Sequence, residues 1–223
     1  MKDNGASFRT VSVPGPVEYQ DIPRKMKMEY NFPAAGKTYK ILDQMSLLLR
    51  QFQRPQLDLK ELMTDAGNLI MKQFSLRQVG IGLRGADGNY RYEVLIGYRA
   101  DTEAANRKIF YTPAQFVDPK VYKGYMISKY AKIFLAEDNP WLESEKEAYN
   151  LPSLLGATRR SLDDYVEGDY LNIHILGKDE EILGWIEVSG TTTGKLPDMA
   201  AVRWMEFIGQ IIAAAIVIHG QRR

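Results

Sequence analysis

The C-terminal part of the chain most constrains what it can fold into. Two apolar runs, Asp169–Gly177 and Glu181–Gly190, are separated by a short polar turn, and both are predicted to be strands. A loop with Gly194 and Pro197 follows, and an amphipathic helix is predicted over Asp198–His219. Strands joined by a tight turn pair in the antiparallel sense, and the helix that follows buries its apolar side on one face of the sheet.

Two helices are predicted before the strands. The first covers Thr38–Gln53, where apolar residues recur at helical spacing. The second begins after Asp58, with Glu61 three residues further on in the spacing of a capping box. Residues 1–36 contain repeated prolines and glycines and are predicted to be an extended N-terminal tail, which leaves 37–223 as the folded domain.

Four more strands are predicted in the middle of the chain. The segment Gly85–Asn89 contains Asp87-Gly88 and is a strong hairpin signal. The simple alternation of a strand places four side chains on one face: Tyr92, Val94, Ile96 and Tyr98. The predicted strands are Gln78–Arg84, Tyr90–Tyr98, Lys108–Thr112 and Ala131–Glu137. The expected fold is therefore α+β, with a central antiparallel sheet of about six strands.

Charge and cysteine content exclude several kinds of function. Lys and Arg number 29 and Asp and Glu 28, so the net charge of +1 gives no electrostatic footprint for nucleic acid or an anionic membrane. The chain has no cysteine, which excludes disulfides, zinc thiolate sites and thiol nucleophiles. The longest apolar run, Ile211–Ile218, is shorter than the ~20 residues that span a bilayer. We expect a cytoplasmic protein.

Three stretches together resemble a known family. They are the hairpin around Ala86-Asp87-Gly88-Asn89, the run Ala131–Asp138, and Ile182–Ser189 followed by Gly194–Asp198 and the terminal helix. In order and spacing they are similar to a GAF domain over about 39–218. The resemblance implies that the N- and C-terminal helices cover one face of the sheet and that lid helices and loops cover a pocket on the other. Members of this family bind cyclic nucleotides, bilins, haem, small acids or nothing.

The sequence argues against some of the cofactors that members of this family bind, but it does not identify one. Bilin attachment commonly needs a cysteine, which the chain lacks. Haem is not expected either, because His174 is most simply a polar residue on a partly exposed strand face. Phe134 and Asp138 match part of the cyclic-nucleotide signature of some GAF domains, but Asn139 stands where a second acid is expected. The cofactor stays unidentified, and no metal site is predicted because no His pair has ligand spacing.

Two further motifs have competing interpretations. The run Gly80–Gly85 matches G-x-G-x-x-G, but a hairpin follows it instead of the helix that a dinucleotide site needs. Its glycines are expected to permit close packing or a bulge. Arg159 and Arg160 either form an anion clamp or belong to a surface ion-pair network with Asp163 and Asp164.

Aromatic residues are dense between residues 92 and 149, and as a set they favour an enclosed cavity below 113–128 and 139–168, although each one alone is more simply a core residue. The predicted ligand-contacting residues are Tyr92, Ile96, Tyr98, Phe110, Tyr125, Tyr130, Phe134, Glu137, Asp138, Tyr149, Arg159 and His174.

The leading hypothesis is a sensory or regulatory domain that binds a small molecule and acts in signal transduction. It dimerises through 38–53 and 198–219 and signals to a separate partner protein. The alternative is a ligand-free interaction module whose pocket is filled by its own aromatic side chains. An enzyme is not expected, because the chain has two histidines, no cysteine and no G-x-S-x-G motif.

Overall fold

The computed structural model describes residues 22–31, 36–140 and 143–221, and the chain divides into two units, Met1–Lys40 and Ile41–Arg223. The first unit contains helix α1, Ile22–Asn31. This helix lies inside the segment for which the sequence predicts an extended tail. Pro23 is its second residue, where a helix tolerates proline because the N–H of the first turn has no intrahelical acceptor. The rest of the predicted tail, 1–21 and 32–35, lies outside the described residues.

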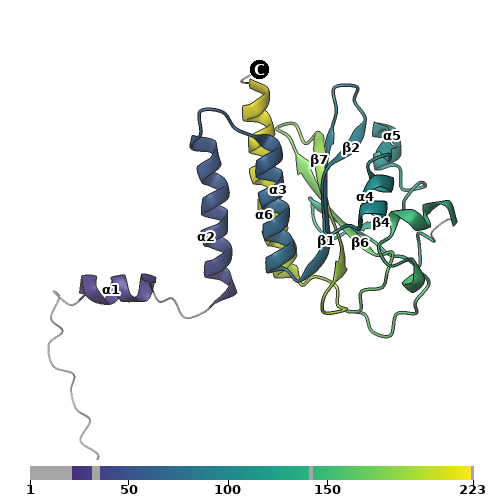
Figure 1. The fold of residues 1–223 in the computed structure, drawn as a ribbon, viewed down its shortest axis with the longest axis horizontal. Coiled ribbons are helices and arrows are strands. Elements are labelled where there is room, and N and C mark those ends of the chain that lie inside the picture. Colours follow the sequence, from purple (N-terminus) through teal and green to yellow (C-terminus); the bar gives the residue numbers. More distant parts are fainter. Residues whose placement is uncertain (1–21, 32–35, 141–142, 222–223) are drawn as a thin grey trace, which may run out of the picture. The chain divides into compact units, whose positions relative to one another are not determined.

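The second unit is built on one antiparallel sheet (Figure 1). Its strands run in the order β3-β2-β1-β7-β6-β5-β4, and every pairing is antiparallel. They are β1 Leu76–Arg84, β2 Tyr90–Ile96, β3 Phe110–Tyr111, β4 Gly124–Met126, β5 Ala131–Phe134, β6 Tyr170–Leu176 and β7 Ile182–Thr191. The α+β antiparallel prediction is confirmed, with seven strands where the sequence indicates about six.

Helices from the two ends of the second unit cover one face of this sheet (Figure 1). The helices next to the sheet are α3, Leu59–Gln73, and α6, Met199–Gln221. The part of α2, Lys37–Arg50, that begins at Ile41 contributes Ile41, Met45 and Leu48 to the same core, and a short 3-10 turn η2, Gln51–Gln53, extends α2. The prediction that helices from both ends of the domain lie on one face of the sheet is confirmed. The core on this face is continuous from helix to sheet and contains Ile41, Leu62, Ile70, Ile81, Ile173, Ile186, Ile208 and Ile212.

Helix α3 begins where the capping signal predicts. The Asp58 carboxylate accepts a hydrogen bond from the Glu61 backbone N–H at 3.0 Å, which satisfies one donor of the first turn. The Glu61 carboxylate instead pairs with Arg54 at 2.7 Å. The cap is therefore one-sided, and an ion pair to the preceding turn replaces the second bond of the capping box.

Helix α6 is apolar enough and long enough, over Met199–Gly220, to cross a bilayer by composition alone. Half of that apolar window is buried inside the protein. The buried residues Val202, Met205, Ile208 and Ile212 pack in the core, so the apolar character of the helix follows from its contact with the sheet.

The middle of the chain covers the opposite face of the sheet (Figure 1). The resemblance in the sequence predicts this lid, and residues 113–117, where the sequence favours a short helical or irregular piece, form the helix α5, Pro113–Val117, with a capping box from Thr112 and Gln115. The lid also contains α4, Ala100–Asn106, and the 3-10 turns η3, Glu143–Ala148, and η4, Pro152–Leu154.

A β-bulge in β2 changes which side chains face the lid. Val94 pairs with Ile81 and Tyr92 with Gly82, so Glu93 is an extra residue in β2. The extra residue moves every later side chain to the other face. Tyr92 consequently faces the lid, while Ile96 packs against α3 in the helix-side core. The predicted common face for these residues is therefore wrong, and Ile96 is not a pocket residue.

Candidate functional site: a tyrosine-lined cavity

Two glycines of β1 make room for aromatic rings on the lid face. A Cβ on Gly82 would lie 2.0 Å from the Trp185 ring, and a Cβ on Gly80 would lie 2.9 Å from the Tyr92 ring. The glycines of the G-x-G-x-x-G match thus permit close packing, as expected, with aromatic side chains as the packing partners. A hairpin follows them, so no helix N-terminus is present to receive a pyrophosphate.

Trp185 lies at the centre of a packed aromatic cluster. The side chain is 1% exposed, and its ring meets those of Tyr92 and Phe116 at 5.0 and 5.1 Å in edge-on or tilted orientations. Phe116 also stacks on Tyr90 at 4.4 Å. Part of the predicted aromatic set therefore fills its own space, as the alternative hypothesis expects. Trp141, another aromatic residue of this region, lies outside the described residues.

Beside this cluster a cavity of about 130 Å³ remains open between the sheet and the lid. Seven tyrosines line it: Tyr92, Tyr98, Tyr111, Tyr122, Tyr149, Tyr165 and Tyr170. Three carboxylates also line it, from Glu167, Asp169 and Glu187, and the described lining includes no Lys, Arg or His. A concave wall of aromatic side chains with a few convergent polar groups is typical of a small-molecule site.

Among the acids of this wall, Glu187 has the most strongly shifted pKa. It lies between Ile186 and Val188, which both face the helix-side core, so the alternation of β7 turns its carboxylate toward the lid. Tyr92 donates its hydroxyl to Glu187 Oε2 at 2.8 Å. Burial raises the pKa of Glu187 to about 7, while hydrogen bonds from the Tyr92 and Trp185 side chains act in the opposite direction.

The Tyr98 hydroxyl is a second polar group of the cavity. It is buried and makes no hydrogen bond of good geometry in the described part of the chain, and its polar neighbour is the Ser189 side chain, which also lines the cavity. Gly97 positions it: its φ is +80°, and a Cβ there would lie 1.9 Å from the Arg77 carbonyl oxygen, so only glycine fits this turn. Burial raises the pKa of Tyr98 well above its ordinary value, so the group stays a neutral hydroxyl.

Hydrogen bonds between side chains and backbone groups join the lid segments to one another and to the end of β2 around the cavity. Glu167, 7% exposed, accepts a bond from the Leu151 N–H at 3.3 Å, and burial raises its pKa. Asn150 donates to the Gly97 carbonyl at 2.8 Å, and Asn106 donates to the Ala148 carbonyl at 3.2 Å. These side chains close the wall that carries Tyr149.

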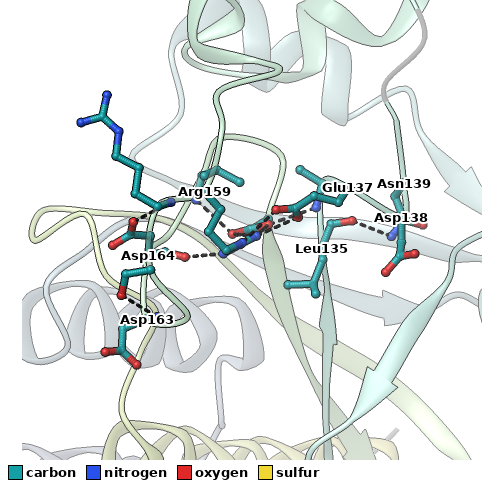
Figure 2. A network of polar contacts seen from close by, with 12 residues as sticks. Leu135, Glu137, Asp138, Asn139, Arg159, Asp163 and Asp164 are labelled. Atoms are coloured by element: carbon teal, nitrogen blue, oxygen red, sulfur yellow. Dashed lines mark hydrogen bonds and ion pairs between the residues drawn. The ribbon is translucent and has the colours of Figure 1, made fainter.

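The lid also contains an ion-pair network, and Figure 2 shows Arg159 at the centre of this network. The guanidinium donates to Glu137 Oε1 at 2.9 Å and to Asp169 Oδ1 at 2.8 Å, and also donates to the Asp164 carbonyl. Asp169, 1% exposed, also accepts the N–H groups of Ala136 and Val166, each at 3.0 Å. Arg159 is thus paired with acids of its own chain, as in the ion-pair alternative, with Glu137 and Asp169 as its partners.

The remaining predicted residues lie apart from the cavity. Asp138 accepts bonds from Lys123 at 2.5 Å and from the Tyr125 hydroxyl at 2.8 Å at the surface. Phe110 is 54% exposed on the edge strand β3, and Tyr130 packs against the helix-side core. These four positions do not line the cavity.

Phe134 and His174 lie on the lid face but outside this cavity. Phe134 stacks on the cavity residue Tyr170 at 4.4 Å. His174 lies 6.1 Å from the Phe116 ring, and burial lowers its pKa, which favours the neutral imidazole. Of the predicted contact residues, Tyr92, Tyr98 and Tyr149 line the cavity.

Sequence reasoning missed Glu187, Glu167 and Tyr165. One signal was available for Glu187, because it is the one acid within the apolar strand Ile182–Thr191. An acid on a strand with apolar neighbours on both sides indicates either exposure or a polar site. Glu167 and Tyr165 lie in a loop, where no periodic pattern predicts direction.

No protein-family model and no curated protein matches the sequence. Solved structures do match the fold. The bacteriophytochrome RpBphP3 from R. palustris has a TM-score of 0.52 at 12% identity, over 85% of this chain and 39% of its own. The GAF domain of an Acinetobacter phosphoenolpyruvate-protein phosphotransferase has 0.50 at 12%, over 81% and 94%.

A GAF domain/HD domain protein from Geobacter sulfurreducens is similar to a comparable degree, with a TM-score of 0.52 at 10% identity, over 74% of this chain and 95% of its own. The chain therefore spans 39% of the bacteriophytochrome but nearly all of the matched GAF structures. The fold is GAF-like, as the resemblance in the sequence predicts.

Proposed function

We propose that this chain is a cytoplasmic sensory domain that binds a small molecule in the tyrosine-lined cavity and acts in signal transduction. The observation that carries the proposal is the cavity of about 130 Å³, whose wall holds the Glu187 carboxylate and the buried Tyr98 hydroxyl. A perturbed acid and a buried hydroxyl without a well-formed hydrogen bond cost free energy, and a ligand that bonds to them offsets that cost.

The two competing functions have less support. A ligand-free module needs a filled pocket, and the aromatic cluster around Trp185 fills only the neighbouring space. For catalysis, a nucleophile within hydrogen-bond reach of a base is the usual requirement. In the described residues the hydroxyl nearest Glu187 belongs to Tyr92, whose pKa burial raises well above its ordinary value. We therefore infer a binding protein without catalytic activity.

A direct route connects the cavity to α6. Tyr165 lines the cavity, and its backbone N–H donates to the Gly194 carbonyl at 3.0 Å. The Leu196 N–H donates to the Asp163 carbonyl at 2.7 Å, and Lys195 pairs with Asp164 at 2.5 Å. The loop that holds these groups leads into α6, so a ligand that favours one position of the lid would bias the start of this helix.

We further propose that α6 and α2 form the interface of a homodimer, through 198–219 and 38–53, with a separate signalling protein as the receiver. Support comes from apolar side chains on the outer sides of these helices. Phe207 and Val217 are 47% and 45% exposed on α6, and Leu42 and Leu49 are 45% and 48% exposed on α2. Apolar side chains that no described segment covers suit a self-complementary interface.

Native mass spectrometry of the purified full chain, with a thermal-shift screen of small molecules, tests ligand binding. The variant Ala148→Leu fills the cavity wall, and Ala104→Leu adds the same atoms on the exposed side of α4 as a matched control. We expect retained mass or a thermal shift in the wild type and in Ala104→Leu, and its loss in Ala148→Leu. A shift that survives Ala148→Leu unchanged would place binding elsewhere, and an empty, unresponsive wild type would favour the ligand-free module.

A further inference from the structure

The charged side chains that line the cavity in the described part of the chain are all acidic. Three carboxylates line it, whereas no cationic side chain does so in the described residues. Asp169 is neutralised by Arg159 and two backbone N–H groups, and Glu167 accepts a backbone N–H. Among the described residues, Glu187 receives bonds from the uncharged Tyr92 and Trp185 side chains. The cavity therefore contains one carboxylate that has no counter-ion in the described part of the chain.

Tyrosine rings form most of the remaining wall. The face of an aromatic ring carries negative charge density and attracts a cation within about 6 Å of its centroid. Tyr92 both holds the carboxylate and presents its ring to the same space, and Tyr111 and Tyr170 lie around it. An anionic ligand would meet repulsion from Glu187, and a neutral ligand would leave the acid without a charge partner.

We propose that the ligand of this cavity is a small organic cation of the substituted-ammonium class, with Glu187 as its counter-ion and the tyrosine rings as its walls. The proposal rests on the ligand-binding function proposed above and names the chemical class of its ligand. A cavity of about 130 Å³ is close to the roughly 150 Å³ that holds a benzene molecule, so the cationic group has on the order of six to eight non-hydrogen atoms.

Three probes of one shape separate the effect of charge from the effect of size. Choline carries a positive charge, 3,3-dimethylbutan-1-ol is its uncharged isostere, and 3,3-dimethylbutanoate is an anion with the same tert-butyl group. Isothermal titration calorimetry on the full chain at pH 8 measures all three. We expect choline to bind at least about tenfold more tightly than the alcohol, because only the cation gains the carboxylate and the ring faces.

The variant Glu187→Gln keeps the shape of the side chain and removes its charge. We expect it to weaken choline binding at least about tenfold and to leave the affinity for the alcohol unchanged. Glu93→Gln, on the exposed bulge of β2, is the matched control and should bind choline like the wild type. Thermal melting of each variant confirms that it is folded before its affinity is compared.

Proton release gives a readout that a merely structural role for Glu187 would not produce. A bound cation favours the ionised carboxylate, so choline binding at pH 7 should release a fraction of a proton, measured by titration in buffers of different ionisation enthalpy. Burial raises the pKa of Tyr92, Tyr98, Tyr111 and Tyr170 above the usual tyrosine range, so they do not contribute. Glu167 also has a raised pKa, and loss of the release in Glu187→Gln assigns it to Glu187.

Each remaining outcome decides against the proposal. Equal binding of the alcohol and choline, or tighter binding of the anion, overturns the cation class and leaves the ligand-binding function standing. The same holds if Glu187→Gln binds choline like the wild type. Failure of choline, tetramethylammonium and methylammonium alike overturns the cation proposal. Retained mass in native mass spectrometry then shows that the binding function survives, and its absence shows that both have failed.

Discussion

Glu187 combines a partly buried strand position with a proposed function that needs its charge. The Glu187 carboxyl group binds its proton more tightly in the folded protein than in the unfolded chain, because its pKa rises from 4.5 to about 7 on folding. Protonation therefore stabilises the fold, and this stability is present below about pH 4.5 and is lost as the pH rises to about 7. An acid kept in an environment that raises its pKa in this way is typical of a functional position.

The first prediction compares the pH dependence of stability in the wild type and Glu187→Gln. Above pH 7 the variant should be more stable by at most about 3 kcal/mol, since it buries no charge, and the difference should shrink toward zero near pH 4.5. Urea unfolding at a series of pH values measures it. A difference that does not change with pH would show that Glu187 has an ordinary pKa.

The second prediction concerns Gly82, whose missing side chain makes room for Trp185. Gly82→Ala places a Cβ 2.0 Å from the ring, so we expect a loss of about 3 kcal/mol in the free energy of unfolding. Gly220→Ala is the control, because its Cβ meets nothing within 4 Å in α6. Denaturant unfolding with tryptophan fluorescence measures both. Equal stability of the two variants would mean that the ring moves aside without cost.

At the scale of elements, regular patterns predict α2, α3, α6 and the long strands, whereas α1, α4 and the short or bulged strand segments are not predicted. The capping signal at Asp58 located the start of α3 because the bond is local. The strand β4 escaped because its three residues, Gly124–Met126, lie at the sheet edge, with two of them exposed, so no alternation marks it. The bulge at Glu93 depends on the pairing with β1, which no local pattern encodes.

In the candidate site, too, some residues are predictable from local sequence patterns and others depend on tertiary contacts. Tyr92, Tyr98 and Tyr149 belong to a run of aromatic residues that is visible in the sequence, and they line the cavity. Glu137 and Arg159 were chosen as chemically suitable groups, but their direction depends on a long connection, and they pair with each other instead. Side-chain direction in loops follows from tertiary contacts, which explains why these positions were not predictable from the sequence.

The third prediction tests the lid as an element held by one buried carboxylate. Asp169→Asn leaves Arg159 without its buried partner, so we expect a loss of about 3 kcal/mol, with protection of the lid amides affected most. Asp138→Asn breaks the surface pair with Lys123 and should cost under about 1 kcal/mol. Hydrogen exchange on residues 150–169 and chemical unfolding measure the two. A uniform loss of protection over the whole sheet would argue against a separate lid element.

At the scale of the whole molecule, the cavity and the outer helix surface lie on opposite faces of one sheet. The sheet, with Ile173 and Ile186 facing the helices and Glu187 facing the lid, separates them. The pairing of Tyr165 with Gly194 and of Asp163 with Leu196 lies between the end of β7 and the start of α6. In this arrangement a binding event that moved this one loop would act on α6, a helix of the proposed dimer interface, without rearranging the core.

The last prediction addresses the proposed dimer and its connection to the cavity. Phe207→Asp places a charge on the outer side of α6, where the side chain is 47% exposed, and should weaken self-association by at least about tenfold without unfolding the chain. Leu162→Asp, at a 93% exposed position of the lid loop, is the matched control and should associate normally. Sedimentation velocity over a range of concentrations measures both.

If the domain signals through these helices, adding choline should shift the association of the wild type and of Leu162→Asp, whereas Phe207→Asp should bind choline and stay monomeric. A monomeric wild type at every concentration would rule out the interface, while an equal response in Phe207→Asp would mean that α6 is not the route by which binding is transmitted.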